Sequence, residues 1–241
     1  MPGDLILSDA HVSLSDGDRV FRLEVDKLTL QPGKAIALTG DSGSGKTLLL
    51  ELLGLLRRPG QGSRYRYDGD NPTDLSGLWR AGARSADLAQ LRGRLFGFVP
   101  QSGGLMPFLT VAENIALPQK LNNRVDPDWC RSLIAALRIE DVTGLYPGAL
   151  SIGQRQRTAI ARALAHRPGF VIADEPTAAL DSDSADSVLE QLLDMSRAHN
   201  SGVILSSHDT ARIARFGLSR LHLSVTTDGS EVISTPKERP C

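Results

Sequence analysis

The stretch AIALTGDSGSGKTLLLELL, residues 35–53, contains the clearest structural signal in the chain. Ala35–Thr39 is a short apolar run, which is typical of a strand buried on both faces. Gly40–Thr47 matches in full the pattern G-x-x-x-x-G-K followed by Ser or Thr. The strongly helical segment Thr47–Arg57 comes next, and Pro59-Gly60 predicts where it ends. Strand, glycine-rich loop and helix in this order predict a phosphate-binding loop in an α/β protein.

The residue types of this loop suit a nucleotide. Glycines let backbone N–H groups converge on phosphate oxygens, and the helix N-terminus adds the positive end of its dipole. We expect Lys46 to reach the β- and γ-phosphates and Thr47 to offer its hydroxyl to Mg²⁺. The residues expected to bind nucleotide here are Gly40, Asp41, Ser42, Gly43, Ser44, Gly45, Lys46 and Thr47. The motif alone leaves a kinase, a GTPase, a helicase and a transport ATPase open.

Size and composition indicate a soluble globular protein. The 241 residues allow one large domain or two small ones, and 41% hydrophobic residues are enough for a core. A net charge of −1 gives no field that would favour nucleic acid. Cys130 and Cys241 make neither a disulfide framework nor a zinc site. The N-terminus does not resemble a secretory signal, and no apolar window of about 18 residues occurs. We expect a cytosolic protein, or one held at a membrane by a partner.

Strands that alternate with helices along the chain predict a mostly parallel sheet. Residues 60–94, rich in Gly, Pro, Ser and Arg, are interpreted as an insertion or a small appended sheet with a helical connector; whether their arginines face a partner or solvent stays open. Residues 224–241 are expected to form a ragged edge. Further expected strands are Leu5–Leu7, Phe21–Leu30 (joined by a turn at Ser15–Asp18), Leu95–Val99, Phe170–Ala173 and Val203–Ser207. Further expected helices are Ser85–Leu91, Val111–Leu117, Pro127–Ile139, Ser151–His166 and Ser184–Asn200.

Polar side chains follow several predicted strands directly. Asp174 ends a buried strand, where its carboxylate suits Mg²⁺ beside the phosphate loop. Glu175, the next residue, is placed to orient or deprotonate an attacking water, which favours hydrolysis over phosphoryl transfer to a second substrate. Gln101 is expected to touch Mg²⁺ or water, and His208 the γ-phosphate. Each residue alone is an ordinary capping or loop residue, and the prediction depends on several strand ends carrying such groups.

These motifs together resemble the ATPase subunit of an ATP-binding cassette (ABC) transporter. Their order is GDSGSGKT, then Gln101 in VPQ, LSIGQ at 150–154, VIADEP at 171–176, Ala179-Leu180-Asp181 and His208. The resemblance implies a P-loop NTPase fold, with a mostly parallel core, an N-terminal antiparallel β subdomain and an α-helical signature subdomain at about residues 102–167. It also implies that residues 1–241 form a single nucleotide-binding domain.

The resemblance further implies a head-to-tail dimer of two copies around two ATP molecules, with Mg²⁺, and Glu175 as catalytic base. Ser151, Gly153, Gln154 and Asp181 then contact the nucleotide held by the other copy. Gly103–Pro118 resembles most the lipoprotein-release, macrolide-export and cell-division group, in which this region contacts the membrane subunit. Export or extraction of a substrate is expected, at the cytoplasmic face of the inner membrane and without nucleic acid. The alternatives are a cassette that transmits force without transport, and a soluble non-transport cassette.

Two positions depart from the family pattern. Leu14 aligns where an aromatic residue often stacks on adenine, and Phe21, the nearest aromatic, is interpreted as a core residue; modest discrimination between ATP and GTP is therefore predicted. Ile152 replaces a signature glycine that would allow close backbone approach to a phosphate. Because the other elements are intact, we expect a working but slower site. Ser151 and Gln154 also have the spacing of a capping box, so ordinary helix capping accounts for part of this motif.

Overall fold

The computed structural model describes residues 3–17, 19–79 and 86–239. Ten strands form one sheet in the order β5-β4-β1-β2-β10-β9-β3-β8-β7-β6. From β9 through β3, β8 and β7 to β6 all neighbours are parallel, whereas β5, β4, β1 and β2 are antiparallel. The strands are β1 (Leu5–Asp16), β2 (Arg19–Leu30), β3 (Ala35–Thr39), β4 (Arg64–Tyr67), β5 (Thr73–Asp74), β6 (Phe96–Val99), β7 (Phe170–Ala173), β8 (Gly202–Ser206), β9 (Ser219–Asp228) and β10 (Glu231–Arg239).

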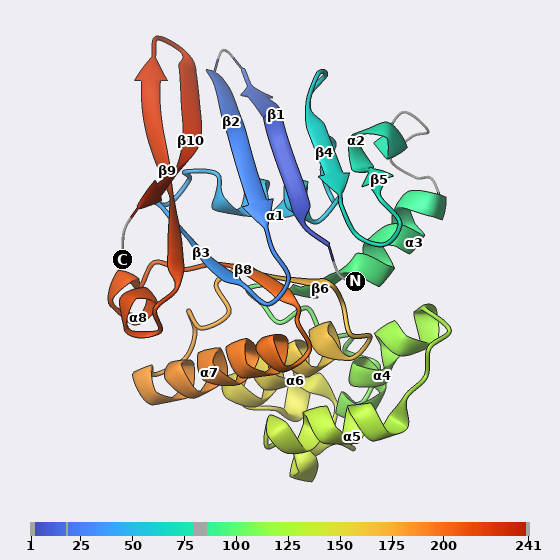
Figure 1. Cartoon of the computed structure of the whole chain (residues 1–241). Coiled ribbons are helices and arrows are strands. Elements are labelled where there is room, and N and C mark those ends of the chain that lie inside the picture. The colour runs from blue at the N-terminus through green and yellow to red at the C-terminus, as the bar shows by residue number, and fades with distance from the viewer. Residues whose placement is uncertain (1–2, 18, 80–85, 240–241) are drawn as a thin grey trace.

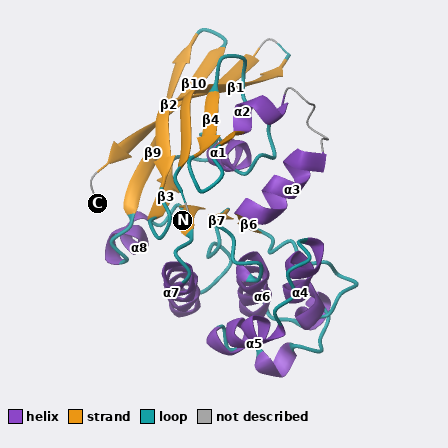
Figure 2. Cartoon of the chain, turned by 45° about the vertical axis from the view of Figure 1, so that its right-hand side comes forward, coloured by secondary structure: helices purple, strands orange, loops and turns teal. Residues whose placement is uncertain are grey.

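The helices gather mainly on one side of the parallel strands. In Figure 1, α4 to α7 lie below these strands, and the antiparallel strands rise above them. Figure 2 shows α3 beside the edge of the sheet, between the strands and the group formed by α4, α5 and α6. The α-helices are α1 (Lys46–Leu53), α2 (Leu75–Leu78), α3 (Ala86–Leu95), α4 (Val111–Leu121), α5 (Pro127–Ala136), α6 (Ile152–Leu164), α7 (Ser182–Ala198) and α8 (Thr210–Arg215).

Two hydrophobic clusters stabilise this arrangement. One joins the parallel strands to α4–α7, through residues such as Ile160, Val171 and Leu192, each 0% exposed. The other joins the antiparallel strands to α1, through residues such as Leu7, Leu23 and Leu49, also 0% exposed. The parallel strands lie between the two clusters, so their side chains are covered on both faces, as their continuous apolar runs predict. The phosphate loop therefore leaves the sheet where both clusters fix the backbone.

The predicted strands and most helices are confirmed, with shifted ends. The predicted end of the first helix is wrong, because α1 ends at Leu53 and not at Arg57. Gly54 caps it, with its N–H bonded to the Leu50 carbonyl at 2.9 Å, and Leu55 then takes a positive φ of 57°. A Cβ at Gly54 would lie 2.5 Å from the Phe98 ring, so this end requires glycine.

The prediction for the C-terminal segment is also wrong. Residues 224–241 were expected to form a ragged edge, but β9 and β10 form an antiparallel hairpin over 219–239. The turn is Gly229-Ser230, between the paired residues Asp228 and Glu231, with Gly229 at φ 58°; a glycine at the first turn position is a hairpin signal that the polar composition obscured. Leu221 and Leu223 point inward and are 6% and 2% exposed.

The arginine-rich region is a small appended sheet, β4 and β5, followed by α2 and α3. Arg64 and Arg66 form surface ion pairs with Asp9 and Asp68, and Arg92 donates to the Leu55 carbonyl. These arginines therefore contact their own chain. Asp18, Ser85 and Cys241, which the sequence predictions name, lie outside the described residues, as do Arg80 and Arg84 of the arginine-rich region. Within the described part of the chain, no helix has the length and apolar character needed to span a bilayer.

Candidate nucleotide site

The phosphate loop runs from β3 into α1 as predicted. Gly43 and Gly45 have positive φ angles of 77° and 93°, which L-residues with side chains rarely adopt. A Cβ at Gly45 would lie 2.9 Å from Cζ of Phe21, so no larger residue fits there. The Lys46 ammonium donates to the carbonyls of Gly40 and Asp41, at 2.8 and 3.1 Å, and is almost fully buried. The Lys46 side chain thus bonds to the carbonyls at the start of its own loop.

Asp174 meets Thr47 at the start of α1. The Thr47 hydroxyl donates to one Asp174 oxygen at 2.9 Å, and the Ser206 hydroxyl donates to the other at 2.6 Å. Ser206 also accepts the Glu175 backbone N–H, at 2.8 Å. Ser206 is fully buried at the end of β8, and sequence reasoning missed it. Its signal was its place in VILSS, two residues before His208.

Glu175 and His208 face each other across two neighbouring strand ends. Nε2 of His208 lies 2.6 Å from Oε1 of Glu175. The Glu175 side chain is only 16% exposed, against 51% for His208, so the carboxylate sits deeper. Glu175 also has a positive φ of 46°, an uncommon conformation for a residue with a side chain. The chain therefore turns sharply at Glu175, directly after Asp174.

A pocket of about 480 Å³ lies over the loop. Gln101, Glu175 and His208 line it together with the loop, so the structure brings the predicted catalytic residues to one place. Leu14 and Phe21 also line it and are paired across β1 and β2. The interpretation of Phe21 as a core residue is therefore incomplete, because its ring packs on the hydrophobic cluster and faces the pocket as well. The full lining is Leu14, Phe21, Ser42, Gly43, Gly45, Lys46, Thr47, Leu48, Gln101, Glu175 and His208.

The donor set fits a triphosphate with Mg²⁺. The glycines, the start of α1 and Lys46 offer positive groups to phosphate oxygens. Thr47 and Asp174 offer a hydroxyl and a carboxylate oxygen held 2.9 Å apart. Among the described residues no group of three or more His, Cys, Asp or Glu side chains is suited to a metal. This sparse set is what Mg²⁺ uses when substrate phosphates and waters supply the remaining ligands.

The signature residues lie outside this pocket. Ser151 caps α6, and its hydroxyl accepts the Gln154 N–H at 3.2 Å while the Gln154 side chain accepts the Ser151 N–H at 2.9 Å. The predicted capping box is therefore confirmed. Ile152 is 49% exposed, and Gly153 lies against Leu180.

Asp181 caps α7 beside this segment and accepts the Ser184 N–H at 3.0 Å, which holds the pKa of its carboxyl below the usual value. Ser151, Gly153, Gln154 and Asp181 thus form a second polar group on the surface, beyond the residues that line the pocket of the same chain. The arginines behind the signature have structural roles. Arg155 donates to the Leu150 carbonyl, and Arg162 donates to the carbonyls of Gly103 and Gly104 at 3.0 and 2.6 Å.

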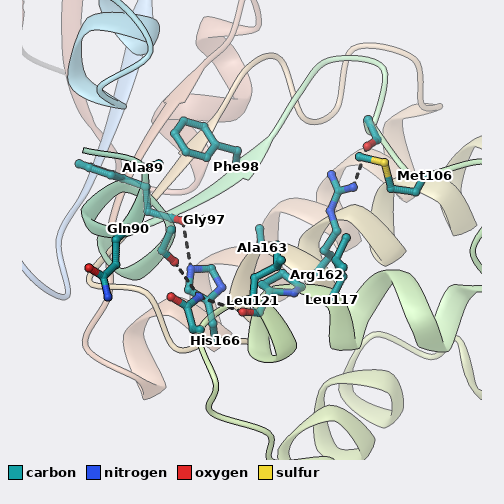
Figure 3. Close-up of a pocket in the computed structure, with 15 residues that line it drawn as sticks. Ala89, Gln90, Gly97, Phe98, Met106, Leu117, Leu121, Arg162, Ala163 and His166 are labelled. Atoms are coloured by element: carbon teal, nitrogen blue, oxygen red, sulfur yellow. Dashed lines mark hydrogen bonds between the residues drawn. The ribbon is translucent and has the colours of Figure 1, made fainter. Parts of the chain in front are cut away.

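A groove of about 560 Å³ lies between α3, α4 and α6, and Figure 3 shows it. Phe98, Met106, Leu117 and Leu121 give it an apolar lining. Two of its side chains contact backbone carbonyls: Arg162 donates to the Gly104 carbonyl, and His166 Nε2 lies 3.0 Å from the Phe96 carbonyl. Burial lowers the pKa of His166. The segment Gly103–Pro118, predicted to contact a membrane subunit, supplies one wall through Gly104, Met106, Leu117 and Pro118.

Comparison with known proteins identifies the family. A family profile described as ABC transporter matches residues 23–178. Lipoprotein-releasing system ATP-binding protein LolD 1 of Caulobacter vibrioides is 40% identical over 214 residues, 87% of either chain. Macrolide export ATP-binding/permease protein MacB of Marinobacter nauticus is 37% identical over 240 residues, which are 97% of this chain but 35% of MacB.

Solved structures agree with these relatives. A dimer of the ATP-binding cassette MJ0796, in a post-hydrolysis state bound to ADP and Pi, superposes with a TM-score of 0.78 at 28% identity. The match covers 98% of this chain and 97% of that one. The predicted ABC-ATPase fold is confirmed, and the relatives favour a transporter ATPase over the non-transport alternatives. The chain belongs to the ABC transporter family and is one of its ATP-hydrolysing cassettes.

Proposed function

We propose that ATP is hydrolysed in the pocket over the phosphate loop. The observation that carries this proposal is the convergence of Lys46, Glu175 and His208 on one pocket. Lys46 and the amides of residues 40–47 hold the phosphates. Thr47, Asp174 and Gln101 would hold Mg²⁺, which would neutralise charge on the β- and γ-phosphates.

The side chains then divide the chemistry. Glu175 accepts the proton of the attacking water, and its low exposure limits competing hydration. His208, 2.6 Å away, donates to the γ-phosphate and leaves one Glu175 oxygen free for the water. Ser206 fixes the Asp174 carboxylate and the Glu175 backbone together.

Two copies assemble head to tail in this proposal. Ser151, Gly153, Gln154 and Asp181 lie outside the pocket of their own chain, so the exposed N-terminus of α6 is available to a nucleotide held by the second copy. The dimeric state of the solved relative supports this arrangement. Residues 1–241 act as one nucleotide-binding domain, with residues 102–167 as its signature subdomain.

Membrane subunits dock against Gly103–Pro118, at the apolar groove of Figure 3. The cassette is then peripheral at the cytoplasmic face of the inner membrane and has no nucleic-acid partner. Two relatives are named for lipoprotein release and macrolide export, and these names support extraction or export of a substrate.

Mixed dimers test the head-to-tail arrangement. Lys46→Ala removes the phosphate ligand, and Ser151→Arg blocks the signature; each variant alone should fail to occlude ATP. In an equal mixture each mixed dimer should occlude one ATP, because one of its composite sites combines an intact loop with an intact signature, whereas dimers of a single variant should occlude none. Trapped radiolabelled ATP per dimer is the measurement. A mixture as inactive as either variant would show that loop and signature must come from one chain.

A further inference from the structure

The C-terminal hairpin contacts the phosphate loop directly. β10 pairs in parallel with β2, and this register sets Ser234 opposite Leu23. Ser234 is fully buried, and its hydroxyl donates to the Ser44 carbonyl at 2.6 Å. The two serines are 190 residues apart in sequence, and Figure 1 shows β10 lying between β2 and β9. A segment that composition assigns to a ragged edge thus holds one carbonyl of the loop.

This bond controls the direction of an amide. The peptide between Ser44 and Gly45 is planar and trans, so its C=O and N–H point to opposite sides. Because the carbonyl points to Ser234, the Gly45 N–H points away from β10. Glycine has little intrinsic preference between the two signs of φ, so a peptide beside Gly45 rotates easily unless a partner restrains it. The Ser234 hydroxyl supplies that restraint.

Phe21 restrains the same residue from β2. Its Cζ would lie 2.9 Å from a Cβ at position 45, and the Ser234 hydroxyl oxygen lies 3.9 Å from that point. Two adjacent strands therefore flank Gly45, one with an aromatic ring and one with a hydroxyl. The loop is held from the sheet side, and its amides are left for the opposite side.

We propose that Ser234 is a positioning residue for nucleotide binding: its hydroxyl orients the peptide 44–45 so that the Gly45 N–H is preset for a phosphate oxygen. The inference rests on the proposed function, in which this loop binds the triphosphate. Without the hydroxyl, the peptide samples the rotated orientation, and binding must select the competent one. The affinity for ATP falls, while the chemical step, carried by Glu175, is nearly unchanged.

A second serine provides a matched control. The Ser201 hydroxyl donates to the Pro168 carbonyl at 2.6 Å, and Ser201 is 1% exposed. It makes the same type of bond, at the same length and burial, but the carbonyl it holds belongs to Pro168 and not to the phosphate loop. A merely structural role for Ser234 would make Ser234→Ala and Ser201→Ala equivalent.

The test measures ATP affinity by titration, together with kcat, KM and the thermal midpoint. Both Ala variants should lower the midpoint by similar amounts. Only Ser234→Ala should weaken ATP binding, by about threefold to tenfold, with kcat within about twofold. Ser234→Thr keeps the hydroxyl and should retain most of the affinity. Equal ATP affinity in Ser234→Ala and Ser201→Ala would overturn the assignment, as would a loss in Ser234→Thr as large as that in Ser234→Ala.

Lys46→Ala separates this inference from the proposed function. In the same titration it should abolish ATP binding, because it removes the phosphate ligand itself. If Lys46→Ala binds ATP like the unmodified chain, the proposed site is wrong, and the Ser234 result then says nothing in its favour. If Lys46→Ala abolishes binding and Ser234→Ala matches Ser201→Ala, the site stands and only the role of Ser234 is refuted.

Discussion

The nucleotide pocket and the groove beside α4 are similar in size, about 480 and 560 Å³, but opposite in construction. Strand ends and a loop build the pocket, and their polar groups bond to one another: Thr47 to Asp174, Ser206 to Asp174, His208 to Glu175. The groove is lined mostly by apolar side chains of α3, β6, α4, α6 and the loop before α4, and its Arg162 and His166 side chains bond to backbone carbonyls. The pocket is prepared for a charged ligand and the groove for an apolar surface.

The difference shows how each region depends on its residues. In the pocket, single polar atoms hold one another in place, so the loss of one group has a large effect on chemistry. In the groove, many apolar atoms share the contact area, so a single substitution acts by introducing an unwanted group. The following experiments use this contrast.

Glu175→Gln should have the largest effect. It keeps the side-chain size but removes the base beside His208, so the ATPase rate should fall about 10²- to 10⁴-fold with ATP binding retained. The control is Glu190→Gln, on an exposed position of α7, which should hydrolyse ATP normally. A Glu175→Gln chain with more than a tenth of the original rate would require a different base.

Leu121→Asp should act on the groove alone. Leu121 is 74% exposed and lines the groove, so a carboxylate there leaves the fold intact but must be desolvated on docking. We expect at least tenfold weaker recovery of the membrane subunits, with basal ATPase within about twofold.

Val125→Asp is the control for Leu121→Asp, because Val125 is 62% exposed but does not line the groove. Co-purification from detergent-solubilised membranes measures the effect. Equal recovery of the membrane subunits with the two variants would show that the groove is not where these subunits dock.

Ser206→Ala should reduce the ATPase rate by about tenfold. It removes the donor to Asp174 and leaves the buried Glu175 N–H without its acceptor, so both carboxylates lose alignment. Ser196→Ala is the control, since Ser196 is 1% exposed and its hydroxyl has no partner among the described residues. If both alanine variants hydrolyse ATP equally fast, the network through Ser206 does not support catalysis.

The sequence predicts the pocket better than the groove for a physical reason. A loop such as Gly40–Thr47 constrains backbone angles and charge over a few adjacent residues, so it is visible in sequence. Ser206 and Ser234 act across strands that are adjacent only after folding, and a single serine carries no such local pattern.

The groove is harder to predict from the sequence than the pocket. Phe98, Met106 and Leu121 belong to β6, a loop and α4, and each alone resembles an ordinary apolar residue. The sequence does not predict the hairpin over 219–239, because its outer face is polar and only Gly229-Ser230 indicates the turn. Gln101, Glu175 and His208 could be predicted because each closely follows a recognisable strand, whereas the hairpin and the groove have no such local signal.

Phe21→Ala tests whether the pocket has an apolar part. Phe21 lines it with Leu14, so the side chains that β1 and β2 contribute to the pocket lining are apolar. The substitution should weaken ATP binding by roughly threefold to tenfold. Tripolyphosphate binding should fall by less, because that ligand loses only the restraint on Gly45 and no contact to a base.

The unmodified chain should bind ATP and GTP within about threefold of each other, because an apolar surface does not distinguish their polar edges. Equal losses of ATP and tripolyphosphate in Phe21→Ala would show that its ring supports only the loop at Gly45. A strong ATP preference would instead require a polar contact to the base.

Ile152→Gly should have the smallest effect. It tests whether the signature is as sensitive to a single side chain as the pocket, or as tolerant of one as the groove. If Ile152 blocks a tightly fitted site, glycine should accelerate ATP hydrolysis many-fold in the assembled complex. Half of the Ile152 surface is exposed, whereas the capping bonds of Ser151 and Gln154 involve neither its side chain nor its amide. The isoleucine can therefore pack at the rim of the dimer interface without displacing Ser151. We expect a rate change below about threefold, as for exposed positions elsewhere. A larger increase would mean that the signature, like the pocket, tolerates no extra atom.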